Sequence, residues 1–268
     1  MRPSADSTWV QPGRRDRFRP VPTGLLFPRG RKKSRPRSNG MIETRTMAAR
    51  TITALLVSFA CLGLSASAMA AEIARPLFWK TTVRIKPNGP TDGVILAGAR
   101  SGGPSGFLVL KTREVEGQEW LALRIGERPN DRVGWVPAFR VEVVEARNRL
   151  LVSVAKRTIT LFLNGKAAWK TRVIVGKPST PTPRGLFAVH DFYRVKDDLR
   201  PWVVETTAHS EVLMTFLGGP ARVALHGRHG ALRAPWGTAV SNGCIRTPDW
   251  ALRSIRKNLP PGSPIEIR

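Results

Sequence analysis

The sequence predicts a mostly-β protein, with a small β domain followed by a β-sandwich or barrel that carries one packed helix. Short apolar runs alternate with polar residues at a period of two along the second half of the chain. The 24 glycines and 22 prolines separate many of these runs, as turns do between strands. Only one segment, near residue 250, combines a helix start with helical apolar spacing. The length of 268 residues suits two modest domains.

Residues 1–40 are rich in Arg, Pro, Ser and Gly and contain 11 Lys and Arg against two Asp. Such a composition buries too little apolar surface to fold alone. We interpret this segment as a disordered basic segment or an over-extended translation start. The chain as a whole carries a formal charge of +25, which favours polyanionic partners. The remaining positive charge is scattered rather than clustered, so we expect no nucleic-acid partner.

Residues 41–70 have the pattern of a signal peptide. Two arginines precede a short apolar run, Ile52–Leu64, and Ala68–Ala70 has the small-x-small form of a cleavage site. The run is shorter than the roughly 20 residues that span a bilayer, and we expect no transmembrane segment in the mature chain. The predicted location is therefore the periplasm or the cell wall, with Cys61 removed on cleavage.

Residues 71–145 are predicted to form the small β domain. Strands are expected at residues 82–86, 107–110, 119–125 and 133–137. The strand with Trp120 followed by Gly134-Trp135-Val136 resembles bacterial SH3-like modules, which implies possible wall or peptide binding. A generic β domain with tryptophan in its core is an equally good interpretation.

Residues 146–268 are predicted to form the second β domain. Strands are expected at residues 151–154, 158–163, 169–175, 186–189, 203–205, 223–225 and 264–267. Asn164-Gly165 is the strongest hairpin turn in the chain. Thr247 is predicted to cap a helix with Pro248 at its first position, and Ala251, Leu252 and Ile255 would form its buried stripe.

Cys244 and His226, 18 residues apart, supply the groups needed for thiol nucleophilic catalysis. The thiolate would attack a carbonyl, and the imidazole would take the proton and later return it. Gly243 lets a substrate approach the backbone, and Arg246 is a candidate for binding a substrate carboxylate through two parallel hydrogen bonds. A helix that begins at Thr247 would favour the thiolate.

The alternative is that Cys244 is a small buried hydrophobe and His226 a core histidine. Two observations favour chemistry. A cysteine left alone in an exported protein has no disulfide partner, and its glycine-flanked, polar surroundings suit an exposed turn. One cysteine with four histidines shows no zinc-ligand spacing, and no glycine-rich phosphate loop is present, so neither a metal nor a cofactor is expected.

Two separated motifs resemble those of the L,D-transpeptidase family, the cysteine enzymes that build or edit peptidoglycan. One is His226-Gly227 followed by Ser241–Arg246, and the other is Gly176–Gly185, with its Pro-Thr-Pro centre. The resemblance spans about residues 147–268. Asn242 stands where the family usually has a second histidine.

The resemblance implies roles for individual residues. Cys244 would be the nucleophile and His226 the general base and acid, with a backbone carbonyl near Gly227 orienting the imidazole. The amides of Gly243 and Cys244 are candidates for the oxyanion hole. Hydrogen bonds from Ser241 and Asn242 would shape the site, although both residues are also ordinary in turns.

The implied function is that of an exported cysteine L,D-transpeptidase acting on peptidoglycan stem peptides through a Cys244 acyl-enzyme. It would form 3→3 cross-links or attach molecules to the cell wall, and β-lactams of the carbapenem type would acylate the same thiol. Two alternatives stay open. One is an L,D-carboxypeptidase or wall hydrolase that uses the same Cys-His pair, and the other is a non-catalytic basic wall-binding protein.

Overall fold

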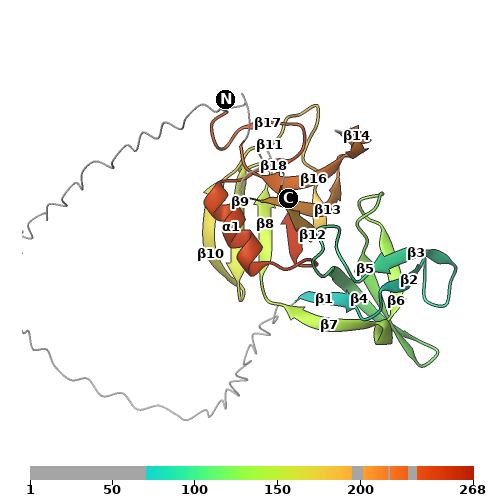
Figure 1. Cartoon of the computed structure of the whole chain (residues 1–268). Coiled ribbons are helices and arrows are strands. Elements are labelled where there is room, and N and C mark those ends of the chain that lie inside the picture. The colour runs from blue at the N-terminus through green and yellow to red at the C-terminus, as the bar shows by residue number, and fades with distance from the viewer. Residues whose placement is uncertain (1–70, 195–201, 217, 229–233) are drawn as a thin grey trace, which may run out of the picture. The chain divides into compact units, whose positions relative to one another are not determined.

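The computed structural model describes residues 71–194, 202–216, 218–228 and 234–268. The predicted basic segment and signal peptide, residues 1–70, lie outside the described residues. The described chain consists of β-strands with one α-helix, which confirms the prediction of a mostly-β fold (Figure 1). No helix in these described ranges is long and apolar enough to cross a membrane.

The first sheet has seven antiparallel strands in the order β3-β2-β6-β5-β4-β1-β7 (Figure 1). Its strands are β1 (Ala71–Pro76), β2 (Lys80–Arg84), β3 (Thr91–Leu96), β4 (Phe107–Val115), β5 (Gln118–Arg124), β6 (Val133–Pro137) and β7 (Val141–Ala146). A single 3₁₀ turn, η1 (Ala138–Arg140), connects β6 to β7. The sequence did not predict β1, which pairs with both β4 and β7 and so ties the two ends of this segment together.

Strand β5 is buried on both faces, whereas the sequence predicted simple alternation. All four residues 120–123 are buried. Trp120 packs with Trp135 on one face, where Lys111 and Arg113 lie 5.3 and 5.9 Å from the centre of the Trp135 ring. The other face packs into the main core of the sheet. The SH3-like interpretation of this domain stays a prediction.

The second sheet has eight strands in the order β10-β9-β8-β19-β12-β13-β16-β18. Its strands are β8 (Arg149–Ser153), β9 (Thr158–Leu163), β10 (Lys166–Arg172), β12 (Gly185–Tyr193), β13 (Val203–His209), β16 (Arg222–His226), β18 (Ile245–Arg246) and β19 (Pro264–Ile267). The hairpin predicted at Asn164-Gly165 is confirmed, and both residues have positive φ, at 48° and 78°. The pairs β8–β19 and β16–β18 are parallel.

Helix α1 (Asp249–Asn258) packs on the second sheet (Figure 1). The predicted stripe of Ala251, Leu252 and Ile255 is buried, and its two larger members belong to the main core of this sheet. The indole N–H of Trp169 in β10 donates to Ser254 Oγ at 2.9 Å, which fixes the helix against the strand. Four shorter strands complete the domain: β11 (Val175–Gly176), β14 (Thr215–Phe216), β15 (Gly219–Pro220) and β17 (Ala239–Ser241).

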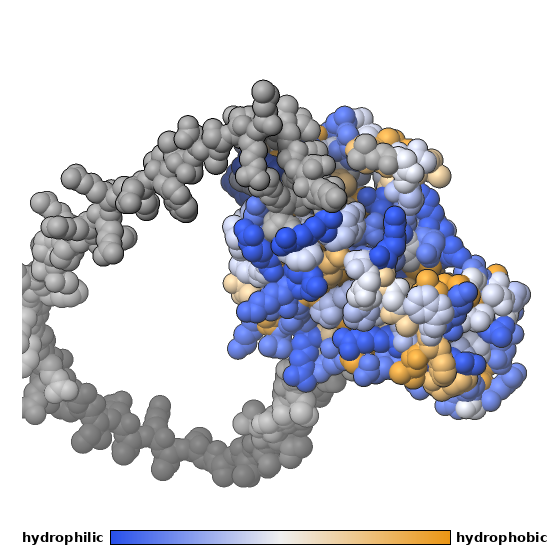
Figure 2. Space-filling view, viewed as in Figure 1, coloured by the Kyte–Doolittle hydropathy of each residue, from blue (hydrophilic) through white to orange (hydrophobic). Residues whose placement is uncertain are grey.

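Hydrophilic residues cover most of the face seen in Figure 2, and hydrophobic residues gather over part of the first sheet. Exposed aromatic side chains of this sheet include Phe78 and Phe139. The guanidinium of Arg140 lies 4.9 and 5.1 Å from the centres of these two rings. The arginine therefore covers part of the apolar surface that the two rings leave exposed.

Candidate active site

Two parallel strands bring the separated halves of the Cys-His motif together. Strand β16 ends at His226, and Cys244 directly precedes β18. The strands pair in register, with Leu225 opposite Ile245 and His226 opposite Arg246. The gap of 18 residues between histidine and cysteine is thus closed by sheet pairing.

A pocket of about 150 Å³ opens beside this strand pair. Five of the residues singled out from the sequence line it: Ser241, Asn242, Cys244, Arg246 and His226. Gly227 and Gly243, also singled out, contribute to the site through their backbones, as described below. A thiol, an imidazole and a guanidinium therefore face one small cavity.

His226 is buried, with 7% of its surface exposed, and its ring is oriented by its neighbour. Its Nδ1 lies 2.7 Å from the carbonyl oxygen of Gly227. Because a carbonyl only accepts, Nδ1 carries the proton and the lone pair of the neutral ring is on Nε2. The position of the Gly227 carbonyl agrees with the orienting role that the resemblance implied.

Burial raises the pKa of the half-buried Cys244 thiol. A hydrogen bond with the backbone of Ala224 and the positive charge of Arg246 act in the opposite direction without offsetting it. The thiol is therefore protonated at neutral pH, and it needs a base before it can attack. The expectation of a resting thiolate was wrong.

The predicted helix cap was also wrong. Helix α1 begins at Asp249 with Pro248 as its N-cap, one residue later than expected. The hydroxyl of Thr247 donates to the Ile245 carbonyl at 3.2 Å, so it does not cap the helix. A short strand, β18, occupies the residues directly before the helix, and its pairing with β16 fixes Thr247 in the sheet.

Ser241 organises the turn that presents the cysteine. Its hydroxyl donates to the Cys244 carbonyl at 2.6 Å and accepts from the Gly243 N–H at 3.2 Å. Gly243 has φ of 112°, which favours glycine. The Gly243 amide is thus engaged within the turn, and of the two amides proposed for an oxyanion hole only that of Cys244 remains a candidate. Asn242 is exposed at the pocket edge.

Residues 147–267 match the family model of the YkuD L,D-transpeptidase catalytic domain. This segment is an L,D-transpeptidase catalytic domain. No curated protein matches the chain. Within the described ranges, no group of three or more His, Cys, Asp or Glu residues is placed to hold a metal ion.

Solved structures similar to the chain are also L,D-transpeptidases. The catalytic domain of the E. faecium enzyme shares 19% identity over 46% of this chain and 98% of its own, with a TM-score of 0.33. The Mycobacterium smegmatis enzyme shares 16% identity over 59% and 98%, with a TM-score of 0.38. L,D-transpeptidase 3 from Mycobacterium tuberculosis, in complex with a faropenem-derived adduct, shares 15% identity over 60% and 97%, with a TM-score of 0.40.

The second motif of the L,D-transpeptidase domain, Gly176–Gly185, supports the cysteine turn. Thr182 accepts a hydrogen bond from the Gly176 N–H at 2.9 Å and donates to the Gly243 carbonyl at 2.8 Å. The backbone N–H of Lys177 donates to the Ser241 carbonyl at 2.9 Å. The two motifs, about 60 residues apart in the chain, therefore form one hydrogen-bonded unit.

Replacing Gly176 by alanine is expected to destabilise this unit. The added Cβ would lie 2.3 Å from the Thr180 carbonyl oxygen and 2.5 Å from the Thr182 nitrogen, so the backbone must move. We expect a loss of about 1–3 kcal/mol in the free energy of unfolding, measured in urea. Gly103→Ala is the matched control, because the nearest atom to its Cβ is 3.9 Å away, and it should change stability little. Equal stability of the two variants would contradict the prediction.

Sequence analysis missed half of the pocket lining. The missed residues lie on β16 or on the segment before it: Ser210, Leu213, Phe216, Ala221, Arg222 and Val223. Arg222 was within reach of a period-two argument, since residues 222, 224 and 226 of one strand point to the same face. Its Nε lies 3.5 Å from Glu205, and both side chains are largely buried. The other missed residues fall in irregular segments where no periodicity could reveal them.

His190 and His209 lie behind the pocket as buried neutral groups. Burial, assisted by the charge of Arg222, lowers the pKa of each to about 4. Both folded-state values are below the unfolded value of about 6.5, so the unfolded chain binds more protons at mildly acidic pH. Arg128 adds to the shift at His209, and Asp191 opposes it at His190.

The protein is therefore expected to lose stability in mild acid. The contribution of these two histidines is complete above about pH 6.5 and is lost as the pH falls toward 4, by about 2 kcal/mol each at pH 5. Urea unfolding at pH 7.5 and pH 5 measures the loss. His209→Gln should show a smaller difference between the two pH values than the parent protein. An identical difference would show that His209 does not titrate in this way.

Proposed function

We propose that this protein is an exported cysteine L,D-transpeptidase that acts on peptidoglycan stem peptides. The observation that carries the proposal is that Cys244, His226 and Arg246 line one pocket within a domain of this family. Export is inferred from the signal-peptide pattern of residues 41–70.

The acylation step follows from the geometry of the two side chains. His226 Nε2 takes the proton of the neutral Cys244 thiol as the sulfur attacks the carbonyl that precedes the terminal D-alanine of the stem. The oxyanion that forms is stabilised by backbone donors such as the Cys244 N–H. When the intermediate collapses, the imidazolium returns the proton to the departing D-alanine nitrogen, and a thioester remains on Cys244.

The transfer step uses the same groups. An amine of an acceptor molecule attacks the thioester carbonyl, and His226 removes a proton from that amine. The new amide forms as the sulfur leaves, and the proton returns to the thiol. Water in place of the amine would give a carboxypeptidase, which uses the same pocket and differs only in the acceptor.

Arg246 supports the choice of an anionic substrate. The residue is 6% exposed, and its Nε and Nη1 are buried without a hydrogen-bond partner in the part of the chain that the structure describes. Burial lowers the pKa of the guanidinium, and the nearby Cys244 acts in the opposite direction. A buried cation with unused donors at a pocket suits a substrate carboxylate, which would accept those hydrogen bonds.

Replacing Arg246 by methionine is expected to separate binding from stability. The variant should bind stem peptide at least tenfold more weakly, because the carboxylate loses its partner. Its fold should be unchanged in stability or more stable by about 1 kcal/mol, since an uncompensated buried charge is removed. Titration calorimetry with a tetrapeptide stem and urea unfolding give the two values. Unchanged affinity would exclude Arg246 from carboxylate binding.

The acylation of L,D-transpeptidases by β-lactams bears on the same thiol. Solved structures of similar enzymes are complexes with imipenem and with a faropenem-derived adduct. For this protein we expect a carbapenem to acylate Cys244, since its strained amide presents a carbonyl to the sulfur in the same way as a stem peptide.

Product analysis tests the proposed function. The purified protein is incubated with a disaccharide tetrapeptide, with and without an added amine acceptor, and the products are identified by mass spectrometry. A transpeptidase gives a cross-linked product and free D-alanine, and the yield depends on the acceptor. Tripeptide alone, whatever the acceptor, would identify a carboxypeptidase. No reaction and no carbapenem adduct would leave a non-catalytic basic wall-binding protein.

A further inference from the structure

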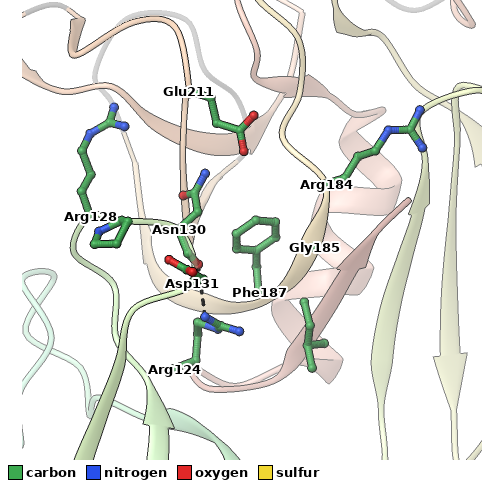
Figure 3. A pocket seen from close by; sticks show the side chains of 10 residues that line it. Arg124, Arg128, Asn130, Asp131, Arg184, Gly185, Phe187 and Glu211 are labelled. Carbon is green, nitrogen blue, oxygen red and sulfur yellow. Dashed lines mark hydrogen bonds between the residues drawn. The ribbon is translucent and has the colours of Figure 1, made fainter. Parts of the chain in front are cut away.

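A loop of the first sheet grips the segment that forms one wall of the cysteine pocket. The loop is residues 125–132, between β5 and β6, and the wall segment is residues 209–213, which follow β13. The two meet beside a cavity of about 680 Å³, where Figure 3 shows Arg128, Asn130 and Glu211 approaching one another. The contacts between them are hydrogen bonds of specific geometry.

Arg128 holds two points of the wall with one guanidinium. Its Nη1 donates to the Ser210 carbonyl at 2.7 Å, and its Nη2 donates to the Leu213 carbonyl at 2.8 Å. Both Ser210 and Leu213 line the cysteine pocket. Because the two carbonyls are three residues apart, this planar fork fixes the curvature of the wall and not only its position.

Asn130 adds a reciprocal pair of hydrogen bonds one residue earlier. Its Nδ2 donates to the His209 carbonyl at 2.9 Å, and its Oδ1 accepts from the His209 N–H at 2.7 Å. A side-chain amide can satisfy a backbone donor and acceptor together. The end of β13 is thereby held at the point where the wall begins.

A third contact runs in the opposite direction. Arg222, which lines the cysteine pocket, donates from Nη1 to the carbonyl of Gly126 in the loop at 2.6 Å. A Cβ on Gly126 would lie 3.0 Å from Arg222 Nη1 and from His190 Nδ1, so this approach is close. Three residues of one loop thus contact three different parts of the pocket lining.

We propose that the loop of residues 126–130 positions the substrate-binding wall of the cysteine pocket, which makes the first sheet part of the catalytic apparatus. Arg128 and Asn130 are positioning residues, since they act on the pocket through the backbone of residues 209–213. The inference rests on the proposed function for its effect on catalysis, but its effect on the wall can be measured independently.

The test compares Arg128→Ala and Asn130→Ala with Arg132→Ala in the full chain. Arg132 is the matched control, because its partner Asp92, at 3.0 Å, lies in the same sheet and its loss should weaken only that sheet. Hydrogen exchange of the amides of residues 209–216 should be about tenfold faster in the two loop variants and unchanged in the control. Unchanged exchange in both loop variants would overturn the proposal.

Two reactions at Cys244 then separate positioning from general destabilisation. Carbapenem acylation should become about tenfold less efficient in the loop variants, mainly through weaker binding, with a limiting rate within about threefold of the parent. Alkylation by iodoacetamide, which needs no wall, should be unchanged or faster. Faster exchange with unaltered acylation would show that the contacts are merely structural, and would also overturn the proposal.

Two further outcomes are decided in advance. If Arg128→Ala does not fold, Arg128→Lys replaces it, because lysine keeps the charge but cannot reproduce the fork, and the same changes of smaller size are expected. If the parent protein is not acylated by a carbapenem and does not process stem peptides, the proposed function fails. Exchange and alkylation then still decide whether the loop holds the wall.

Discussion

Cys244→Ala is expected to abolish both transpeptidation and carbapenem acylation while leaving the fold intact. The sulfur forms the covalent bond in both reactions, and a methyl group cannot replace it. Mass spectrometry of the protein after incubation with a carbapenem should show an adduct for the parent and none for the variant. The expected loss of rate reaches the background of the assay, which is the largest effect predicted for this protein.

Thermal unfolding provides the control for this variant. Cys244 is half-buried and has no disulfide partner in the described chain, so its loss removes little packing and the unfolding temperature should shift by only a few degrees. A variant that stays folded and still forms the adduct or the cross-linked product would exclude Cys244 as the nucleophile. The remaining cysteine of the chain, Cys61, would then be the first alternative to examine in a preparation that retains the signal segment.

His226→Gln is expected to reduce acylation by a factor of about 10²–10⁴, which corresponds to about 3–5 kcal/mol in activation free energy. The reason is the protonation state of the thiol. Burial raises the pKa of Cys244, so that few thiolates exist at neutral pH unless a base removes the proton. A resting thiolate would have made the histidine far less important to this step.

The pH dependence of the same variant gives a second measurement. Without the imidazole, only molecules that have already lost the thiol proton can react, so the acylation rate of His226→Gln should rise about tenfold per pH unit up to the raised pKa of Cys244. The parent should show a shallower rise near neutral pH. A variant rate within threefold of the parent, with the same pH profile, would show that His226 is not the base.

Much of the fold could be predicted from the sequence because local signals agreed with the final structure. The strand Thr158–Leu163, the Asn164-Gly165 turn and the buried stripe of α1 all lie where alternation, turn residues and helical spacing placed them. The failures lie where tertiary contacts outweigh local pattern. Strand β5 is buried on both faces, and β1 and β18 are strands only because neighbours far away in sequence pair with them.

The candidate site was predicted in part for a similar reason. Cys244, His226, Ser241, Asn242 and Arg246 belong to a compact motif, and the structure places all five around one pocket. The opposite wall, which includes Ser210 and Leu213, has no motif of its own. It acquires its place through hydrogen bonds to Arg128, more than 80 residues earlier in the chain, and such a partnership leaves no trace in local sequence.

The sequence by itself determined which reactive groups are available: one thiol outside the predicted signal peptide, one imidazole near it in the chain, and a guanidinium two residues beyond the thiol. Only the tertiary structure decided the state of those groups. The degree of burial sets the pKa of the thiol and leaves the Arg246 guanidinium with unused donors, and burial depends on strands brought together from distant parts of the chain. Desolvation is a property of the packed surroundings, and it cannot be read from the residue or its neighbours in sequence.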